Sequence, residues 1–210
     1  SEFSFMPDQL VSICIPAYEN AVFLKRLLDS IVTQNYLDIE VIISDDSAGE
    51  DIKNALSDYE GKLNIRYFKN IQALKTPANW NNALDKANGD LLILMHQDDW
   101  FADAAAIRKY VDVFERKSKI DFVFCRSMAF DENVPDKLQV FHRKILADLQ
   151  NHPEGLLLGN VIGPPSNLMF RKNVRVRYAL PYIWLVDVEY YIRLLKAGHQ
   201  YFFLDEPLVS

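Results

Sequence analysis

The chain has little of what several protein classes require. Its two cysteines, Cys14 and Cys125, each lie inside an apolar run typical of a buried strand, so the sequence predicts neither a disulfide framework nor a cysteine metal site. No apolar run approaches the ~20 residues needed to cross a bilayer, and residues 1–10 show no secretion signal. We therefore expect a soluble, cytoplasmic protein without a transmembrane segment, and leave open an association with the inner face of a membrane.

Positive charge is also scarce. The sequence has 23 Lys and Arg against 29 Asp and Glu, a formal net charge of −6, and no run of basic residues. Proteins that follow the phosphates of a nucleic acid usually carry a basic patch, so we expect no nucleic-acid partner. An anionic ligand would need a cation or a few well-placed groups to offset its charge.

Several catalytic signatures are missing as well. The sequence contains no G-x-x-x-x-G-K-[ST], G-x-G-x-x-G or G-x-S-x-G, and its four histidines are scattered. These absences disfavour a P-loop ATPase, a dinucleotide oxidoreductase, a serine hydrolase and a zinc enzyme.

What is present indicates one α/β domain. With 210 residues, half of them apolar, the chain is long enough for one substantial core and short for two. We interpret residues 1–10 as a tail and residues 11–210 as the domain. The abrupt end at residues 208–210 leads us to expect a fragment of a longer protein.

Strand and helix patterns alternate over the first ~117 residues. Four apolar runs typical of strands are each followed by a helical pattern, and Thr76 and Pro77 are expected to cap and open the third helix. The fold class predicted is a doubly wound, mostly parallel sheet with helices on its faces. After Phe124 the pattern loosens, and Asp131 to Gln139 is expected to be a loop.

Acidic pairs follow two of the predicted strands. Asp98 and Asp99 come directly after the run Leu91 to Met95, and Asp45 and Asp46 follow Ile39 to Ile43. Ligands bind at the carboxyl ends of parallel strands, and paired carboxylates suit a hard divalent cation that bridges them to a diphosphate. The alternatives are a solvated turn for the first pair and an Asx turn or helix cap for the second. Two acidic clusters on neighbouring strand ends would repel each other unless a cation or hydrogen-bond donor lay between them.

Two further segments have both a functional and a structural interpretation. Pro16 to Asn20 places the ring of Tyr18 where it could lie against a nucleobase, or it is an ordinary helix start. Asp187 and Glu189 lie at the start of a predicted helix. At that position a favourable interaction with the helix dipole explains Asp187, and an ion pair with Arg193 explains Glu189, so neither residue requires a catalytic role.

The order of these motifs resembles the inverting glycosyltransferases of family 2, which have the GT-A nucleotide-sugar-binding fold. The likeness extends from Val11 to Val209 and rests on five matches in order. The first two are residues 11–20, which contain the P-x-Y turn, and residues 41–47, which end in D-D-x-S. The next two are Asn81 with residues 87–90, and residues 96–99 at the place of a D-x-D-D metal motif. The last is Asp187 with Arg193, Gly198 and residues 205–208.

The resemblance implies a role for each matching residue. Asp46 would hydrogen-bond the nucleobase and Tyr18 would pack against it, in a pocket lined by Pro16 and Glu19. The remaining roles fall to three carboxylates. Asp98 would meet the ribose, Asp99 would hold Mg²⁺ or Mn²⁺ on the diphosphate, and Asp187 would be the general base.

Two positions depart from the family pattern. His96 stands where many relatives have the first Asp of the metal motif, which favours a metal contact by one Asp and weakens the case for strict metal dependence. Trp80 stands where many relatives have Arg, so a diphosphate contact is expected to be missing there.

The resemblance implies an inverting transfer of a sugar from a nucleotide-diphosphate sugar, a UDP-sugar above all, to a hydroxyl of a saccharide or lipid-linked glycan acceptor. Polysaccharide or glycoconjugate biosynthesis is the expected context. A nucleotidyltransferase on a related sheet and a non-catalytic nucleotide-sugar-binding domain remain as alternatives, because a fold does not determine a function.

Overall fold

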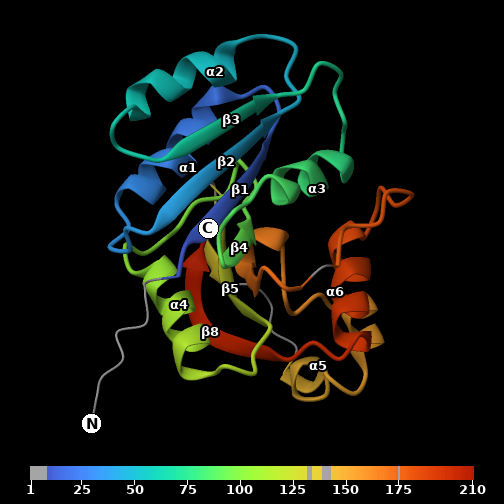
Figure 1. The fold of residues 1–210 in the computed structure, drawn as a ribbon. Coiled ribbons are helices and arrows are strands. Elements are labelled where there is room, and N and C mark those ends of the chain that lie inside the picture. The colour runs from blue at the N-terminus through green and yellow to red at the C-terminus, as the bar shows by residue number, and fades with distance from the viewer. Residues whose placement is uncertain (1–8, 132–133, 139–142, 175) are drawn as a thin grey trace.

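The structure, a computed structural model, describes residues 9–131, 134–138, 143–174 and 176–210 (Figure 1). Its helices and strands follow in the order β1 (Val11–Ala17), α1 (Ala21–Val32), β2 (Ile39–Asp45), α2 (Asp51–Ala55), η1 (Leu56–Tyr59), β3 (Ile65–Lys69), α3 (Ala78–Asp85), β4 (Leu91–Leu94), α4 (Ala106–Arg116), β5 (Phe122–Asp131), β6 (Val134–Leu138), α5 (Arg143–Ala147), η2 (Pro153–Leu157), η3 (Pro165–Asn167), β7 (Leu168–Arg171), α6 (Val186–Lys196) and β8 (Tyr201–Val209).

One mixed sheet organises the molecule. Its strand order is β3-β2-β1-β4-β7-β5-β6, and β8 pairs with β5. The first four strands are mutually parallel, β5 pairs in parallel with β8, and β7 is antiparallel to both β4 and β5. The predicted α/β class with a mostly parallel, doubly wound sheet is confirmed.

Helices cover both faces of this sheet because successive strand residues point to opposite sides. On β1, Ile13 and Ile15 pack into a core formed with α1 and α4, whereas Cys14 packs into a second core with α3 and α6. Figure 1 shows α1 and α4 on one side of the sheet and α3 and α6 on the other. Cys14 and Cys125 are both buried and unpaired.

The first helix begins directly after the β1 loop. The Asn20 side chain caps it by accepting a hydrogen bond from the Phe23 N–H at 3.3 Å. Its buried residues have the helical spacing of one apolar face: Leu24, Leu27, Leu28 and Ile31. Among the described residues, no helix combines the length and the apolar character that membrane crossing requires.

Two local predictions were wrong. Within the expected loop Asp131 to Gln139, residues 134–138 form strand β6, because antiparallel pairing with β5 orders a segment that has no strand pattern of its own; residues 132, 133 and 139 lie outside the described residues. Thr76 does not cap α3, which begins at Ala78 with Pro77 in the cap position and no side-chain cap bond. The preceding backbone is instead held by a tertiary contact with Asp46.

Candidate active site

The carboxyl ends of β1 and β4 lie side by side where the strand order reverses, since β1 pairs with β2 on one side and with β4 on the other. Gln97 joins the loops that follow the two strands. Its Oε1 accepts a hydrogen bond from the Tyr18 N–H at 2.8 Å, and its Nε2 donates to the Tyr18 carbonyl at 2.9 Å. Ligands of open α/β sheets bind in the crevice formed at such a reversal.

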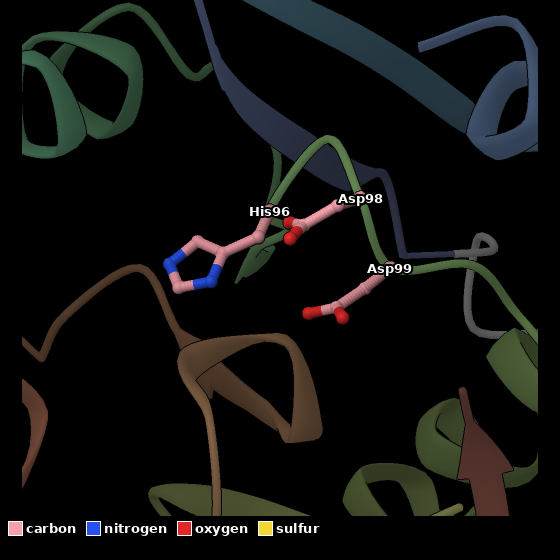
Figure 2. Close-up of side chains that lie close together, drawn as sticks. All are labelled: His96, Asp98 and Asp99. Carbon is pink, nitrogen blue, oxygen red and sulfur yellow. The ribbon is translucent and has the colours of Figure 1, made fainter. Parts of the chain in front are cut away.

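Three side chains of the turn after β4 point into one space: His96, Asp98 and Asp99 (Figure 2). One ligand atom from each lies within 4.8 Å of the others. Among the described residues, the buried Nε2 of His96 has no hydrogen-bond partner, and a bound cation would supply one. Two carboxylates and an imidazole fit a divalent cation such as Mn²⁺, which accepts both oxygen and nitrogen ligands.

Ser166, from the short helix η3, supports this turn. Its Oγ accepts a hydrogen bond from the His96 N–H at 3.0 Å, and its hydroxyl bonds the Asp99 carboxylate. Burial raises the pKa of Asp99 and neighbouring Asp98 raises it further, and together they outweigh the lowering effects of Ser166 and His96. A divalent cation would oppose this shift, because an opposite charge favours the ionised carboxylate.

Arg26 of α1 contacts the same turn. Its Nη2 donates to the Asp98 carbonyl at 2.8 Å, and its guanidinium lies 3.8 Å from the centre of the Trp100 ring. The Trp100 backbone exchanges two hydrogen bonds with Ser210, at 2.9 and 3.0 Å. The acidic turn is therefore held by α1 and by the end of β8.

Asp46, at the end of β2, is 7% exposed and anchors the loop before α3. Its Oδ1 accepts hydrogen bonds from Asn70 Nδ2 at 2.8 Å and from the Leu74 N–H at 3.0 Å, and its Oδ2 accepts one from the Lys75 N–H at 2.8 Å. One lone pair of Oδ2 remains for a ligand.

Asp45 has a structural role beside it. This carboxylate is fully buried and accepts hydrogen bonds from the Ser47 N–H at 2.8 Å, from the Tyr67 hydroxyl at 2.7 Å and from Lys69 Nζ at 3.1 Å. Burial raises the pKa of Asp45, but these hydrogen bonds outweigh it and hold the pKa below its usual value. Ser47 in turn accepts a hydrogen bond from the Glu19 N–H at 2.7 Å, which ties the ends of β1 and β2 together.

Two adjoining pockets occupy the crevice. One, of about 340 Å³, is lined by Asp46 and by residues of the loop before α3, including Lys75. The other, of about 490 Å³, is lined by Glu19, His96 and Asp98. They share three lining residues, which are Pro16, Tyr18 and Trp80. The predicted base pocket and the acidic turn thus border one continuous crevice.

A larger hollow of about 810 Å³ lies elsewhere, against the edge strand β3 and the segment α2–η1. It is lined by neither acidic pair and by none of the predicted site residues. We therefore assign the site by its chemistry rather than by size.

Asp187 contacts the segment that precedes Ser166. It lies half-buried in the first turn of α6, and its Oδ2 accepts a hydrogen bond from Asn160 Nδ2 at 3.1 Å. The Asn160 side chain also accepts from the Gly163 N–H at 3.0 Å and donates to the Gly163 carbonyl at 3.1 Å. Asp187 lines neither of the two pockets, and its role as the base stays a prediction.

Five of the seven predicted site residues line these two pockets: Pro16, Tyr18, Glu19, Asp46 and Asp98. Asp99 lines neither pocket but lies beside them, grouped with His96 and Asp98. Sequence reasoning missed Gln97, Lys75 and Asn160. Gln97 lies inside the motif His96 to Asp99, so the sequence contained a signal for it. Lys75 and Asn160 had none, because their importance depends on contacts with distant segments.

Comparison with known proteins finds similar sequences and similar folds. The model of the family described as glycosyl transferase family 2 matches residues 12–192. The chain is 32% identical over 91 residues to the GalNAc(5)-diNAcBac-PP-undecaprenol beta-1,3-glucosyltransferase of Campylobacter jejuni, covering 42% of this chain and 29% of that protein.

Solved structures show a similar fold. TarS 1-349 of S. aureus in complex with UDP superposes with a TM-score of 0.73 at 16% identity, covering 95% of this chain and 59% of that one. The mannosyltransferase PcManGT of Pyrobaculum calidifontis, in complex with GDP-Man and Mn²⁺, superposes with a TM-score of 0.70 at 14% identity, covering 98% and 59%. The chain spans less than two thirds of the length of each of these three proteins.

Proposed function

The chain belongs to glycosyltransferase family 2, and on that basis we propose that it transfers a sugar from a nucleoside-diphosphate sugar to an acceptor hydroxyl with inversion at the anomeric carbon. The observation that supports this most is the crevice at the β1/β4 reversal. It joins a pocket beside Asp46, suited to a base, to the acidic turn at His96, Asp98 and Asp99.

A divalent cation, Mg²⁺ or Mn²⁺, belongs to this proposal because the acidic turn fits one. Asp99 would hold it with help from His96, and Asp98 would meet the ribose or share the cation. When bound, the cation neutralises charge on the diphosphate leaving group. The imidazole makes Mn²⁺ the better fit of the two ions.

The chain's own residues would bind and orient both substrates. Tyr18 is 63% exposed, so its ring is free to lie on a nucleobase whose polar edge meets Asp46. Asp187, held by Asn160, would accept the proton of the acceptor hydroxyl while the hydroxyl oxygen forms a bond to the anomeric carbon. The bond from that carbon to the diphosphate breaks in the same step, and the nucleoside diphosphate leaves on the opposite face.

The donor and acceptor are proposed as classes. A UDP-sugar is the donor of choice because TarS has been solved with UDP and UDP-GlcNAc, although PcManGT holds GDP-Man. A saccharide or lipid-linked glycan is the proposed acceptor, since the Campylobacter jejuni relative is named for an undecaprenol-linked glycan. We place the reaction in polysaccharide or glycoconjugate biosynthesis.

Replacing Asp187 with Asn tests the central role. The amide oxygen can still accept the hydrogen bond from Asn160, but the amide cannot act as a base. Turnover is therefore expected to fall by about 10²–10⁴, while donor affinity changes less than about twofold. Turnover is measured as release of nucleoside diphosphate from UDP-, GDP- and dTDP-sugars, and affinity by calorimetry with UDP, GDP and dTDP, with and without Mn²⁺.

Asp51→Asn is the matched control, because Asp51 is an exposed acid in the first turn of α2. It should leave turnover unchanged. Unchanged turnover in Asp187→Asn would remove Asp187 from the mechanism. Release of pyrophosphate would favour a nucleotidyltransferase, and binding of nucleotide sugar without turnover would favour a non-catalytic domain.

A further inference from the structure

The helix α3 supplies no positive charge to the crevice. It contains neither Lys nor Arg, and its residue Trp80 lies against His96 of the acidic turn. The Trp80 ring lies 4.8 Å from the His96 ring and packs edge-on against Tyr178 at 5.0 Å, centre to centre. These contacts hold the indole in place, so Trp80 contributes an apolar surface where a phosphate needs a cation.

The crevice is otherwise acidic. Its two pockets are lined by the carboxylates of Glu19, Asp46 and Asp98, and Asp99 adjoins them. A donor diphosphate adds further negative charge, which a cation at the acidic turn would offset at one end only. Like charges at such distances disfavour binding unless a positive group intervenes.

Lys75 is positioned to supply that group. Among the described residues that line the two pockets, it is the only Lys or Arg; the other basic side chain there is the imidazole of His96 in the acidic turn. The Lys75 N–H is fixed to Asp46 Oδ2 at 2.8 Å, its side chain is exposed, and its ammonium has no ion pair with any described residue. The neighbouring Lys69, by contrast, is committed to Asp45 and to the Gly49 carbonyl at 2.6 Å.

The backbone conformation of Lys75 also indicates that this residue has a function other than exposing a charge to solvent. Its φ is +64°, in the left-handed region that glycine adopts at lower cost. A long charged side chain therefore occupies a position where the backbone conformation favours glycine, which has no side chain. Backbone conformations of this kind concentrate at functional sites.

We propose that the Lys75 ammonium binds the phosphate groups of the nucleotide-sugar donor, an inference that rests on the proposed function. Lys75 supplies from the loop before α3 the positive charge that Trp80 does not supply from the helix. Together with a cation at His96, Asp98 and Asp99, it would hold the diphosphate from two sides.

The test compares ligands with and without phosphates. Wild-type chain and Lys75→Met are titrated with UDP, GDP and dTDP by calorimetry in the presence of Mn²⁺. The nucleoside of the best-bound diphosphate is titrated by ligand-observed NMR. A charge-assisted hydrogen bond predicts that Lys75→Met weakens the diphosphate about 10–100-fold and the nucleoside less than about twofold.

Three variants serve as controls. Lys75→Arg should restore most of the affinity, because it keeps the charge. Lys75→Gly should lose as much as Lys75→Met, because it removes the charge while easing the left-handed backbone. Lys119→Met, at an exposed lysine between α4 and β5, should bind like wild type.

The outcomes separate the two proposals. Suppose that wild type binds a diphosphate. If Lys75→Met binds it equally well, or if its affinity for the nucleoside falls as much as its affinity for the diphosphate, the phosphate role of Lys75 is wrong while the proposed function stands. If wild type binds none of the three diphosphates, the proposed function is wrong and the role of Lys75 falls with it.

Discussion

At the residue scale, one side chain often serves both the site and the local backbone. Asp46 is expected to meet a nucleobase, yet three of its hydrogen bonds already go to Asn70, Leu74 and Lys75. Removing the Asp46 carboxylate would therefore disturb the loop before α3 as well as the base pocket. A loss of binding in an Asp46 variant would combine a lost base contact with a displaced loop.

Gly89 illustrates a residue whose side chain would not fit. A Cβ at Gly89 would lie 2.5 Å from Ser12 Oγ, 2.7 Å from the Leu10 carbonyl oxygen and 2.8 Å from the Ser12 nitrogen. Because two of these atoms are backbone of a buried strand region, Gly89→Ala is expected to lower the free energy of unfolding by about 1–3 kcal/mol. Urea denaturation measures it.

Gly49→Ala is the matched control, since a Cβ at Gly49 would have nothing within 4 Å. It should change the free energy of unfolding by less than about 0.5 kcal/mol. Equal stability of the two alanine variants would contradict the close approach of residue 89 to β1.

At the scale of elements, a buried carboxylate joins three strands and a loop at the end of the sheet opposite the crevice. Glu40 of β2 is 2% exposed and accepts hydrogen bonds from Ser12 Oγ of β1 at 2.6 Å, from Arg66 Nη1 of β3 at 3.1 Å and from the Asn88 N–H at 2.6 Å. Burial raises the pKa of Glu40, but these bonds outweigh it and hold the pKa below its usual value.

The lowered pKa predicts a pH-dependent contribution to stability. The folded chain prefers the ionised Glu40, so its contribution is complete above the unfolded pKa of 4.5 and is lost as the pH falls through the lower folded pKa. Glu40→Gln should cost about 1–3 kcal/mol of unfolding free energy at pH 7. The difference from wild type should shrink below about pH 4.5.

Urea denaturation between pH 3 and pH 7 measures this difference directly. Glu60→Gln, at an exposed residue, is the control and should follow wild type at every pH. A wild-type minus Glu40→Gln difference that stays constant over this pH range would show that ionised Glu40 contributes nothing specific.

At the scale of the whole molecule, the ligand site joins segments that are far apart along the chain. The crevice uses loops after β1, β2 and β4, and the η3 segment and the end of β8 support its acidic turn. A ligand that contacts several of these segments in the folded state alone must stabilise the whole domain against unfolding.

Thermal unfolding tests that coupling. At 100 times its dissociation constant, a nucleoside diphosphate with Mn²⁺ should add about 2.7 kcal/mol, which corresponds to a rise of about 5–10 °C in Tm for a domain of this size. Asp99→Ala should lose the part of the rise that depends on Mn²⁺. Asp112→Ala, on the surface of α4, should keep it, and a rise unaffected by Asp99→Ala would contradict the metal role of Asp99.

The amino-acid pattern alone was sufficient to predict the features that depend on short-range periodicity. The helical spacing of Leu24, Leu27, Leu28 and Ile31 and the apolar run Leu91 to Met95 predicted the elements that form, because burial of one face requires that periodicity. Since the carboxyl ends of parallel strands share one edge, the placement of Asp46 and Asp98 at two adjoining pockets also followed.

Features that depend on residues distant along the chain became apparent from the folded arrangement alone. Gln97 bonds Tyr18 across 79 residues, β6 is a strand only through pairing with β5, and Lys75 joins the crevice only because Asp46 fixes its backbone. None of these contacts leaves a periodic trace in the chain. Each depends on how the loops are brought together, which is set by the packing of the whole sheet and not by the residues beside them.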